Sequence, residues 1–541
     1  MRNSGNSNKN NNKGENDFAE MEYMNITIVT SNEPYGISDS SNPFFYKRTP
    51  KFNLTLGGVH SGHVQRGLRD PICISRSGKG NCKDGYTKET SGPDSVRVLV
   101  ATRAKPSKNF NSELDREFYD NFLEVLNRPE ETGRFNFSTQ FRYYREELFI
   151  ANLSNTQLGG KPVVFDMDMS AGDFLSLFYL LKVPVEIIDL KAVIVSPTGW
   201  ANAATIDVVY DLFHMMGRDD IPIGLGDMFA LNQSEPGFPS AGDCKYAKAV
   251  PQGCGGFLDS DTLYGLARDL PRSPRRNTAE NSVANGAPRD TDRPEIRQPL
   301  ALEVWQNLTK SVNEVSKSKI TVLTNGPLTS LAKIISSEVY IVGGHISREK
   351  SDKGNVFTVP LNAYAEFNMF LDPLAAKTVL ESGLNITLIP LATQRKFSFQ
   401  PMLNRLYSSA KTPEARFVKR LLARLQALHQ NHRRYTHIDM VLGEILGAVF
   451  LGGDHASLKP KLRVEHIKVI AEENESKDGQ ILIDKLRGKQ IKILERVDLR
   501  GCYVSFASRL DDKKQSAVIG SFEEQRKKWN TPPSSETSML D

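Results

Sequence analysis

The segment 161–181, KPVVFDMDMSAGDFLSLFYLL, is the most constraining feature of this sequence, because an apolar strand pattern runs directly into aspartates and then into an apolar helix. A buried strand followed at once by a helix is typical of a parallel α/β sheet. Ligands of such sheets bind outside the carboxyl ends of the strands, and carboxylate oxygens there suit a hard cation. The segment therefore predicts a metal site near Asp166, Asp168 and Asp173. The structural alternative is a helix N-terminus that attracts acids through its dipole.

The same alternation of strands and helices continues along the chain. The expected strands are 163–168, 191–196, 221–224, 320–324, 339–342 and 386–391, and the expected helices are 174–182, 201–216, 300–315, 328–335 and 373–382. This order predicts an α/β fold with an open, mostly parallel, doubly wound (Rossmann-like) sheet. The Gly-, Pro- and Arg-rich stretch 234–297 is too long for an idle connection, so we expect an ordered wall rather than a lid or disorder.

The two ends of the chain resemble each other. Residues 58–126 and 461–510 each give short strands, an Asp-Gly turn and a further strand, which implies a duplicated module. We therefore expect a disordered low-complexity start (1–17), the C-terminal remnant of a first module (18–150), a whole module (161–510) and a C-terminal tail (511–541).

Charge and hydropathy exclude two classes of partner. The 69 basic and 64 acidic residues nearly balance, which gives no electrostatic case for nucleic acid. No apolar run reaches the roughly 18 residues of a membrane span. The sequence leaves a homo-oligomer possible.

Cysteine spacing and glycosylation acceptors bear on the compartment. Cys73 with Cys82, and Cys244 with Cys254, could each close a short loop, and we expect their Cα atoms within about 7 Å. Eight asparagines stand in N-x-S/T acceptors: Asn25, Asn53, Asn136, Asn152, Asn232, Asn307, Asn385 and Asn474. Together they favour a secretory history, although no cleavable apolar leader follows Met1.

Four motifs occur in a defined order: DMDMSAGD (166–173), NGPLTSLA (325–332), VGG (342–344) with AEFN (365–368), and HID (437–439) before an apolar helix. In this order they resemble the inosine-uridine-preferring nucleoside hydrolases, most closely the plant extracellular members that carry two modules in tandem. The resemblance implies a sheet of the nucleoside hydrolase type and a role in purine nucleoside catabolism, in the extracellular space or apoplast. The implied reaction is hydrolysis of the N-glycosidic bond of purine or pyrimidine ribonucleosides to ribose and base.

The resemblance also implies roles for particular residues. Asp168 would be a Ca²⁺ ligand and the base that takes a proton from water, while Asp173, Asp439 and the backbone carbonyl of Asn325 would complete the protein ligands. The positions that match the family's ribose-binding residues are Asn355, Glu366 and Asn368.

This chain departs from the family pattern at three places. Gly172 stands where the family has an acid, Met169 and Ser170 replace Pro-Gly, and residues 197–200 replace a Gly-Asn. These changes predict weak turnover that improves with Gly172→Asp. They also leave open a catalytically impaired member that binds Ca²⁺ or a nucleoside.

A second enzyme class also fits the first motif. Haloacid-dehalogenase-type phosphatases end a buried strand in a similar pattern, with Asp166 as nucleophile and Asp168 as acid/base. No downstream strand ends in the paired acids that this class needs.

Overall fold

The structure is a computed structural model that describes two compact units of the chain. It describes residues 22–29, 74–75, 95–103, 141–150, 159–196, 203–227, 230–232, 269–276, 299–315, 319–334, 338–347, 349–356, 361–431 and 442–533, with single residues at 137, 267 and 359. The first unit comprises residues 1–144, 261–265 and 277–292, and the second comprises the rest. Cys73, Cys82, Cys244, Cys254, residues 1–17, residues 197–200, His437 and Asp439 lie outside the described residues.

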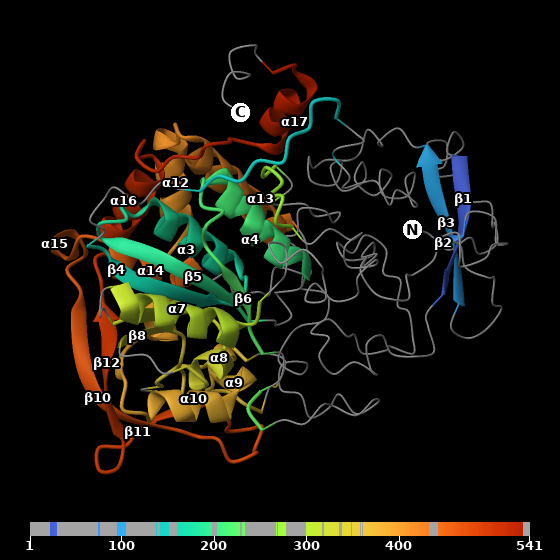
Figure 1. The fold of residues 1–541 in the computed structure, drawn as a ribbon. Helices are drawn as coiled ribbons and strands as arrows, with labels where there is room; N and C mark the ends of the chain where they lie inside the picture. Colours follow the sequence, from blue (N-terminus) through green and yellow to red (C-terminus); the bar gives the residue numbers. More distant parts are fainter. Residues whose placement is uncertain are drawn as a thin grey trace. The chain divides into compact units, whose positions relative to one another are not determined.

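The second unit is built on one large sheet (Figure 1). Its strands are β4 (Lys161–Met167), β5 (Ile188–Val195), β6 (Ile223–Leu225), β7 (Thr321–Thr324), β8 (Glu338–Val342), β9 (Asn385–Ile389), β10 (Lys461–Val469), β11 (Ile481–Ile483) and β12 (Lys489–Arg496). The described strands follow the order β11-β10-β12-β9-β8-β7-β4-β5-β6. Pairing is parallel from β12 to β6, and β10 pairs antiparallel with both β12 and β11. The expected mostly parallel, doubly wound α/β fold is confirmed.

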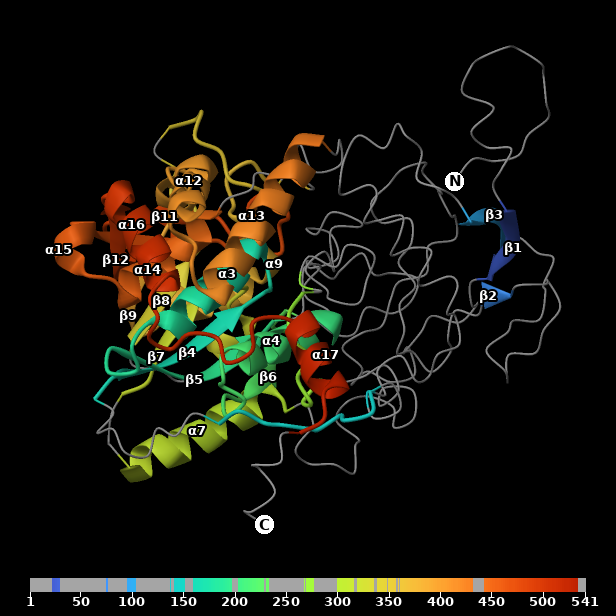
Figure 2. The same ribbon diagram turned by 90° about the horizontal axis from the view of Figure 1, so that it is seen from above.

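Helices cover both faces of this sheet (Figure 1). The helices are α3 (Ala171–Lys182), α4 (Ala203–Met215), α7 (Ala301–Val315), α8 (Thr329–Ala332), α9 (Phe367–Leu371), α10 (Pro373–Leu380), α11 (Leu391–Gln394), α12 (Phe399–Ser409), α13 (Pro413–Asn431), the 3-10 turn η7 (Leu442–Glu444), α14 (Ile445–Gly452), α15 (His455–Leu458), α16 (Leu499–Leu510) and α17 (Phe522–Asn530). Helices α7, α8 and α10 pack their apolar residues against the strands on one face. Helices α3 and α14 lie together on the other face, and Phe417 of α13 packs against Phe174 and Phe178 of α3 (Figure 2).

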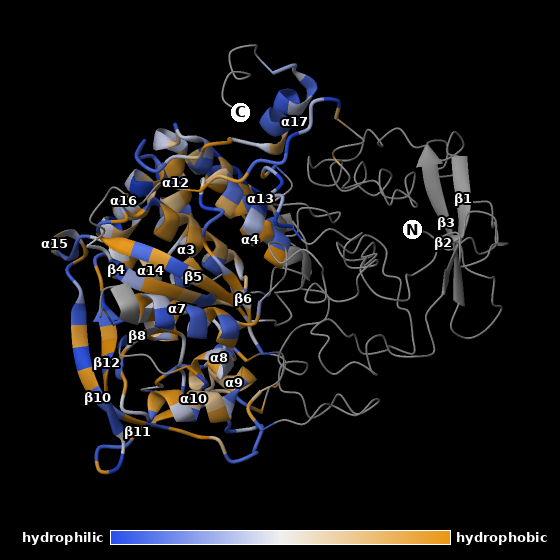
Figure 3. Cartoon of the chain, viewed as in Figure 1, coloured by the Kyte–Doolittle hydropathy of each residue, from blue (hydrophilic) through white to orange (hydrophobic). Residues whose placement is uncertain are grey.

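Hydropathy follows this layering. The central strands are apolar, as expected for parallel strands covered on both faces, whereas β10 near the edge alternates between polar and apolar residues (Figure 3). Val163, Val164 and Phe165 of β4 are completely buried or nearly so. The centre of the sheet is therefore a rigid base for whatever follows the carboxyl end of β4.

The direction of the chain across the sheet reverses beside β4. From β4 the chain moves through β5 to β6 on one side, then returns through α7 to β7 on the other side of β4. The carboxyl ends of β4 and β7 therefore flank a topological switch point, which is where open α/β sheets bind ligands.

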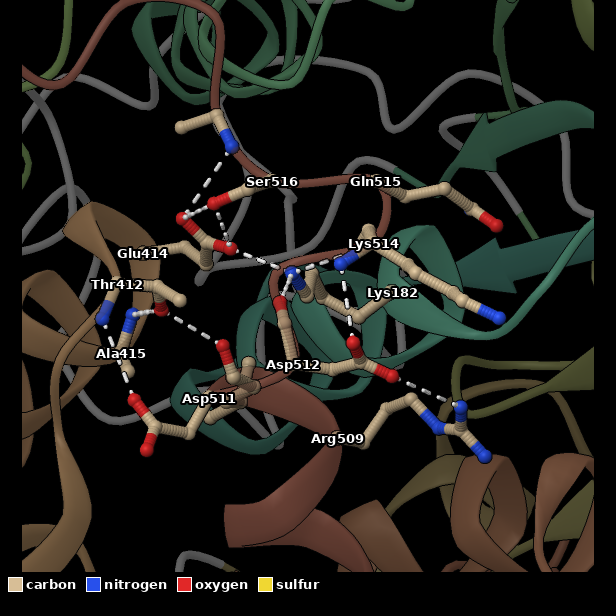
Figure 4. Close-up of polar contacts among 12 residues, drawn as sticks. Lys182, Thr412, Glu414, Ala415, Arg509, Asp511, Asp512, Lys514, Gln515 and Ser516 are labelled. Carbon is tan, nitrogen blue, oxygen red and sulfur yellow. Dashed lines mark hydrogen bonds and ion pairs between the residues drawn. The ribbon is translucent and has the colours of Figure 1, made fainter.

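A buried ion pair ties the end of α3 to the C-terminal segment 511–517 (Figure 4). The Lys182 ammonium lies 2.5 Å from Glu414 Oε1 and donates to the backbone oxygens of Asp512 and Lys514. The hydroxyl of Ser516 donates to both oxygens of Glu414. Further on, Gln525 of α17 accepts from the backbone amide of Arg272, and Asp211 of α4 accepts from the backbone amide of Ser273. Part of the long stretch 234–297 therefore packs against both the expected tail and α4.

The described strands of the first unit form a small antiparallel sheet. Strand β1 (Glu22–Val29) pairs with β2 (Ile74–Ser75) and β3 (Ser95–Arg103), in the order β2-β1-β3. The order β11-β10-β12 in the second unit is the same when the strands are counted along the chain. Within the described part of the chain, no helix is long and apolar enough to span a membrane.

Candidate functional site

Asp168 follows the carboxyl end of β4 and is 3 % exposed. The next residue, Met169, has a φ of 62°, a left-handed conformation that non-glycine residues rarely adopt. Ser170 then caps α3: its hydroxyl accepts from the Asp173 amide, and the Asp173 carboxylate accepts from the Ser170 amide. The strained turn therefore brings Asp168 and Asp173 to one point, and strain of this kind is frequent at functional sites.

Asp173 links the two strands that flank the switch point. One of its oxygens accepts from the Asp168 backbone amide at 2.9 Å, and the other accepts from the Asn325 side-chain amide at 2.9 Å. Asn325 follows β7, as Asp168 follows β4. Asn368 in turn donates to the Asn325 backbone oxygen at 2.6 Å. The structure thus brings together Asp168, Asp173, Asn325 and Asn368, four residues that the sequence assigns to the site.

Two other predicted residues lie at the edge of this cluster. Glu366 is the N-cap of α9, and its carboxylate accepts from the backbone amides of Gly344, Asn368 and Met369. The Asn355 side-chain oxygen accepts from the Phe367 amide at 2.7 Å. Both residues therefore order the turn that carries Asn368.

The carboxylate of Asp166, the first acid of the motif, is occupied by hydrogen bonds to neighbouring strand ends. Its two oxygens accept from Ser196 and Thr324, which stand after β5 and at the end of β7. Burial raises its pKa to about 7, against the effect of these hydrogen bonds. Asp166 therefore clamps three neighbouring strand ends below Asp168.

Glu444 belongs to the cluster and is absent from the predicted set. It ends η7, directly before α14, and its carboxylate accepts a short hydrogen bond from the Ser170 hydroxyl. Its backbone oxygen accepts from the Asn325 side chain at 3.3 Å. A signal was present, since Glu444 is the one charged residue in the apolar run 442–452.

The electrostatics of the cluster are those of an uncompensated negative site. Burial and then the adjacent Asp173 hold the pKa of Asp168 well above its ordinary value. Burial and Asp173 likewise raise the pKa of Glu444, and burial raises the pKa of Asp173. Within the described residues, no basic side chain pairs with these three carboxylates.

This donor set fits a hard cation. The side-chain oxygens of Asn325 and Asn368 are buried without a hydrogen-bond partner in the described structure, and such groups call for an explanation. Across the described ranges, no three His, Cys, Asp or Glu side chains are arranged to hold a metal by themselves. Ca²⁺ takes six to eight oxygens, roughly, including amide and backbone oxygens, so the orphaned amides match its needs.

Comparison with known proteins identifies the family. Residues 163–504 match the family described as inosine-uridine preferring nucleoside hydrolase. The chain belongs to this family. It is 88 % identical to Nucleoside hydrolase 4 of Arabidopsis thaliana over 99 % of this chain and 98 % of that protein. It is 80 % identical to Nucleoside hydrolase 3 of the same plant, over 99 % of this chain and 61 % of that longer protein.

Among solved structures, a plant nucleoside hydrolase, the PpNRh1 enzyme, aligns with 65 % of this chain and 99 % of its own at a TM-score of 0.45 and 22 % identity. Membership of the nucleoside hydrolase family identifies the chain as a hydrolase of N-glycosyl bonds. The phosphatase alternative is thereby set aside.

Proposed function

We propose that this nucleoside hydrolase cleaves the N-glycosidic bond of purine and pyrimidine ribonucleosides at the cluster around Asp168, with Ca²⁺ as cofactor. The observation that carries the proposal is the convergence of Asp168, Asp173, Asn325 and Asn368 at the switch point between β4 and β7. N-glycoside cleavage passes through an oxocarbenium-like transition state that needs a positioned, activated water on one face of the sugar.

Asp168 is the proposed base. The Ser170 amide donates to one of its oxygens at 3.2 Å, which fixes the carboxylate. Its raised pKa, caused first by burial, makes it a stronger proton acceptor than an exposed aspartate. Asp173, Glu444 and Asn325 supply oxygens for the cation, together with the predicted ligand Asp439. For Asn325 we assign the side-chain oxygen, because the backbone oxygen expected from the sequence accepts from Asn368. When bound, Ca²⁺ supplies positive charge that favours ionised carboxylates and activation of water.

Asn355, Glu366 and Asn368 are the proposed ribose contacts. The partnerless oxygen of Asn368 can accept from a sugar hydroxyl. Glu366 already accepts three backbone amides, so we assign it mainly to holding the turn in place.

Calcium binding should stabilise the folded protein. At a Ca²⁺ concentration 100 times the dissociation constant, we expect the free energy of unfolding to rise by about 2.7 kcal/mol. The physical reason is that the cation relieves repulsion among the buried acids. Differential scanning fluorimetry with and without chelator measures the shift, with Mg²⁺ as the matched control. An unchanged midpoint would argue against a cation at this cluster.

The substrate range tests the reaction itself. Purified protein incubated with inosine, adenosine and uridine should release free base and reducing sugar, in buffer free of phosphate. If Ca²⁺ binds and no substrate of the panel turns over, the chain is the catalytically impaired binding member that its departures from the family pattern suggest.

We also propose an extracellular location and a duplicated origin. The acceptor asparagines Asn232, Asn307, Asn385 and Asn474 are exposed, as N-glycosylation requires. The strand order shared by the small sheet β2-β1-β3 and the antiparallel edge β11-β10-β12 of the large sheet supports residues 18–150 as the remnant of a first module. Mass spectrometry of the unreduced protein from its natural source should find Cys73 bonded to Cys82 and Cys244 bonded to Cys254. Free thiols at all four positions would remove the argument for an oxidising compartment.

A further inference from the structure

Gly172 occupies the second position of α3, beside Asp173, and its missing side chain leaves space that Glu444 fills. A Cβ built on Gly172 would lie 2.8 Å from Glu444 Cβ and 3.1 Å from its carboxyl carbon, and Oε2 would be closer still. All three contacts are tighter than real Cβ atoms normally make. The glycine is therefore needed for the position that Glu444 adopts.

Several contacts hold Glu444 across the start of α3. The Ser170 hydroxyl donates to its carboxylate. Its backbone oxygen accepts from Ser176 of α3 at 3.4 Å and from Asn325 at 3.3 Å. Ser176 also donates to the Gly172 backbone oxygen at 2.8 Å. The glutamate is thus locked by α3 and by the residue after β7, and it does not reach the site as a loose surface side chain.

The carboxylate of Glu444 lies beside the two aspartates of the cluster. It accepts from the hydroxyl of Ser170, and the backbone amide of the same serine donates to Asp168 and to Asp173. Its carboxylate therefore adds negative charge beside the two aspartates, from the direction in which an acid at position 172 would project.

We propose that Glu444 supplies the site with the carboxylate that position 172 lacks, and that glycine at 172 is the space this longer side chain requires. An acid at 172 and a glutamate at 444 then exclude each other. This inference rests on the proposed function. It predicts that Gly172→Asp alone does not raise turnover, unlike the prediction made from the sequence, because the new side chain would collide with Glu444.

A double-mutant cycle tests the pairing. Alanine favours a helix over glycine, so Gly172→Ala would stabilise α3 if the space were open. We expect Gly172→Ala to lower the unfolding midpoint in the wild-type background and to raise it in the Glu444→Gly background, where the Cβ that lies 2.8 Å away is also gone. Additive effects of the two substitutions on the midpoint would overturn the pairing.

Calorimetric titration with Ca²⁺ tests whether the Glu444 carboxylate supports cation binding. This measurement does not depend on enzymatic activity. Glu444→Gly should weaken Ca²⁺ binding by roughly 10- to 100-fold, the size of effect expected when a group that supports a metal site is lost. Gly172→Asp in the Glu444→Gly background should regain most of that affinity. The matched control, Gly172→Ala with Glu444→Gly, fills the same space without a carboxylate and should stay weak.

Equal affinities for the two double variants would refute the role of Glu444 as a replacement acid. Failure of the proposed function gives a different result, since wild-type protein would then bind no Ca²⁺ while the unfolding cycle still reported on the pairing.

Discussion

Asp168→Asn should lower kcat for inosine by about 10³-fold, within the range of about 10²- to 10⁴-fold that general acid–base catalysis contributes. Asparagine keeps the shape of the side chain and cannot accept the proton of an attacking water. The same substitution removes a buried acid that is crowded by Asp173 and Glu444. The protein without Ca²⁺ should therefore unfold at the same midpoint or at a higher one.

Steady-state kinetics and thermal unfolding of the same preparation separate these effects. Asp454→Asn is the matched control, because Asp454 is an exposed cap of α15 outside the cluster and its loss should leave kcat unchanged. Turnover of Asp168→Asn within about tenfold of the wild-type value would remove Asp168 from the proposed mechanism, since that is less than a general base contributes.

Lys182→Met should lower the free energy of unfolding by about 3 to 5 kcal/mol, the usual cost of removing one partner from a buried ion pair. Both side chains of the pair are completely buried. Without the ammonium, Glu414 keeps Ser516 and the Ala517 amide but has no cation beside it (Figure 4). The backbone oxygens of Asp512 and Lys514 also lose their donor.

Urea unfolding measures this cost, and a second substitution shows its origin. Lys182→Met combined with Glu414→Gln removes both charges and should recover at least half of the lost free energy. The exposed pair Lys527 and Glu523 of α17 is the control, because surface pairs contribute only about 0.2 to 1 kcal/mol. A loss below about 1 kcal/mol for Lys182→Met would mean that the pair does not anchor the C-terminal segment in the way that a buried pair should.

The parts of the site that are local in sequence could be predicted. Asp168 and Asp173 are five residues apart, and the change from strand to helix between them fixes where both carboxylates point. The order of strands and helices could also be predicted, because hydrophobic periodicity is a local property of the sequence. The structure agrees with most expected elements to within a few residues.

The parts that depend on distant residues could not be predicted. The Asn368 amide reaches the Asn325 backbone oxygen across 43 residues, and Ser170 reaches Glu444 across 274. From the sequence, Lys182 is an ordinary basic residue in the last turn of a helix, a position where the helix dipole favours positive charge. Its burial depends on Glu414, 232 residues away, and on Asp512, 330 residues away. No pattern within one window of sequence carries that information.

Gly172 shows why a departure from a family motif has to be examined in three dimensions. In the sequence alone, Gly172 appears as the loss of a carboxylate, which predicts a weakened site. In the structure the position is filled by a carboxylate from η7. An active-site pattern therefore has to be judged by the groups that occupy the space as well as by the residues that occupy the motif.

The most direct test of the account is the release of ribose and base from inosine by purified wild-type protein through one cycle of chelation and calcium return. We predict one ribose for each base, loss of turnover when a chelator removes Ca²⁺, and recovery when Ca²⁺ is restored. Turnover that survives complete removal of the cation, or no turnover with Ca²⁺ shown to be bound, would contradict the claim that the acidic cluster at β4 and β7 is a calcium-assisted hydrolase site.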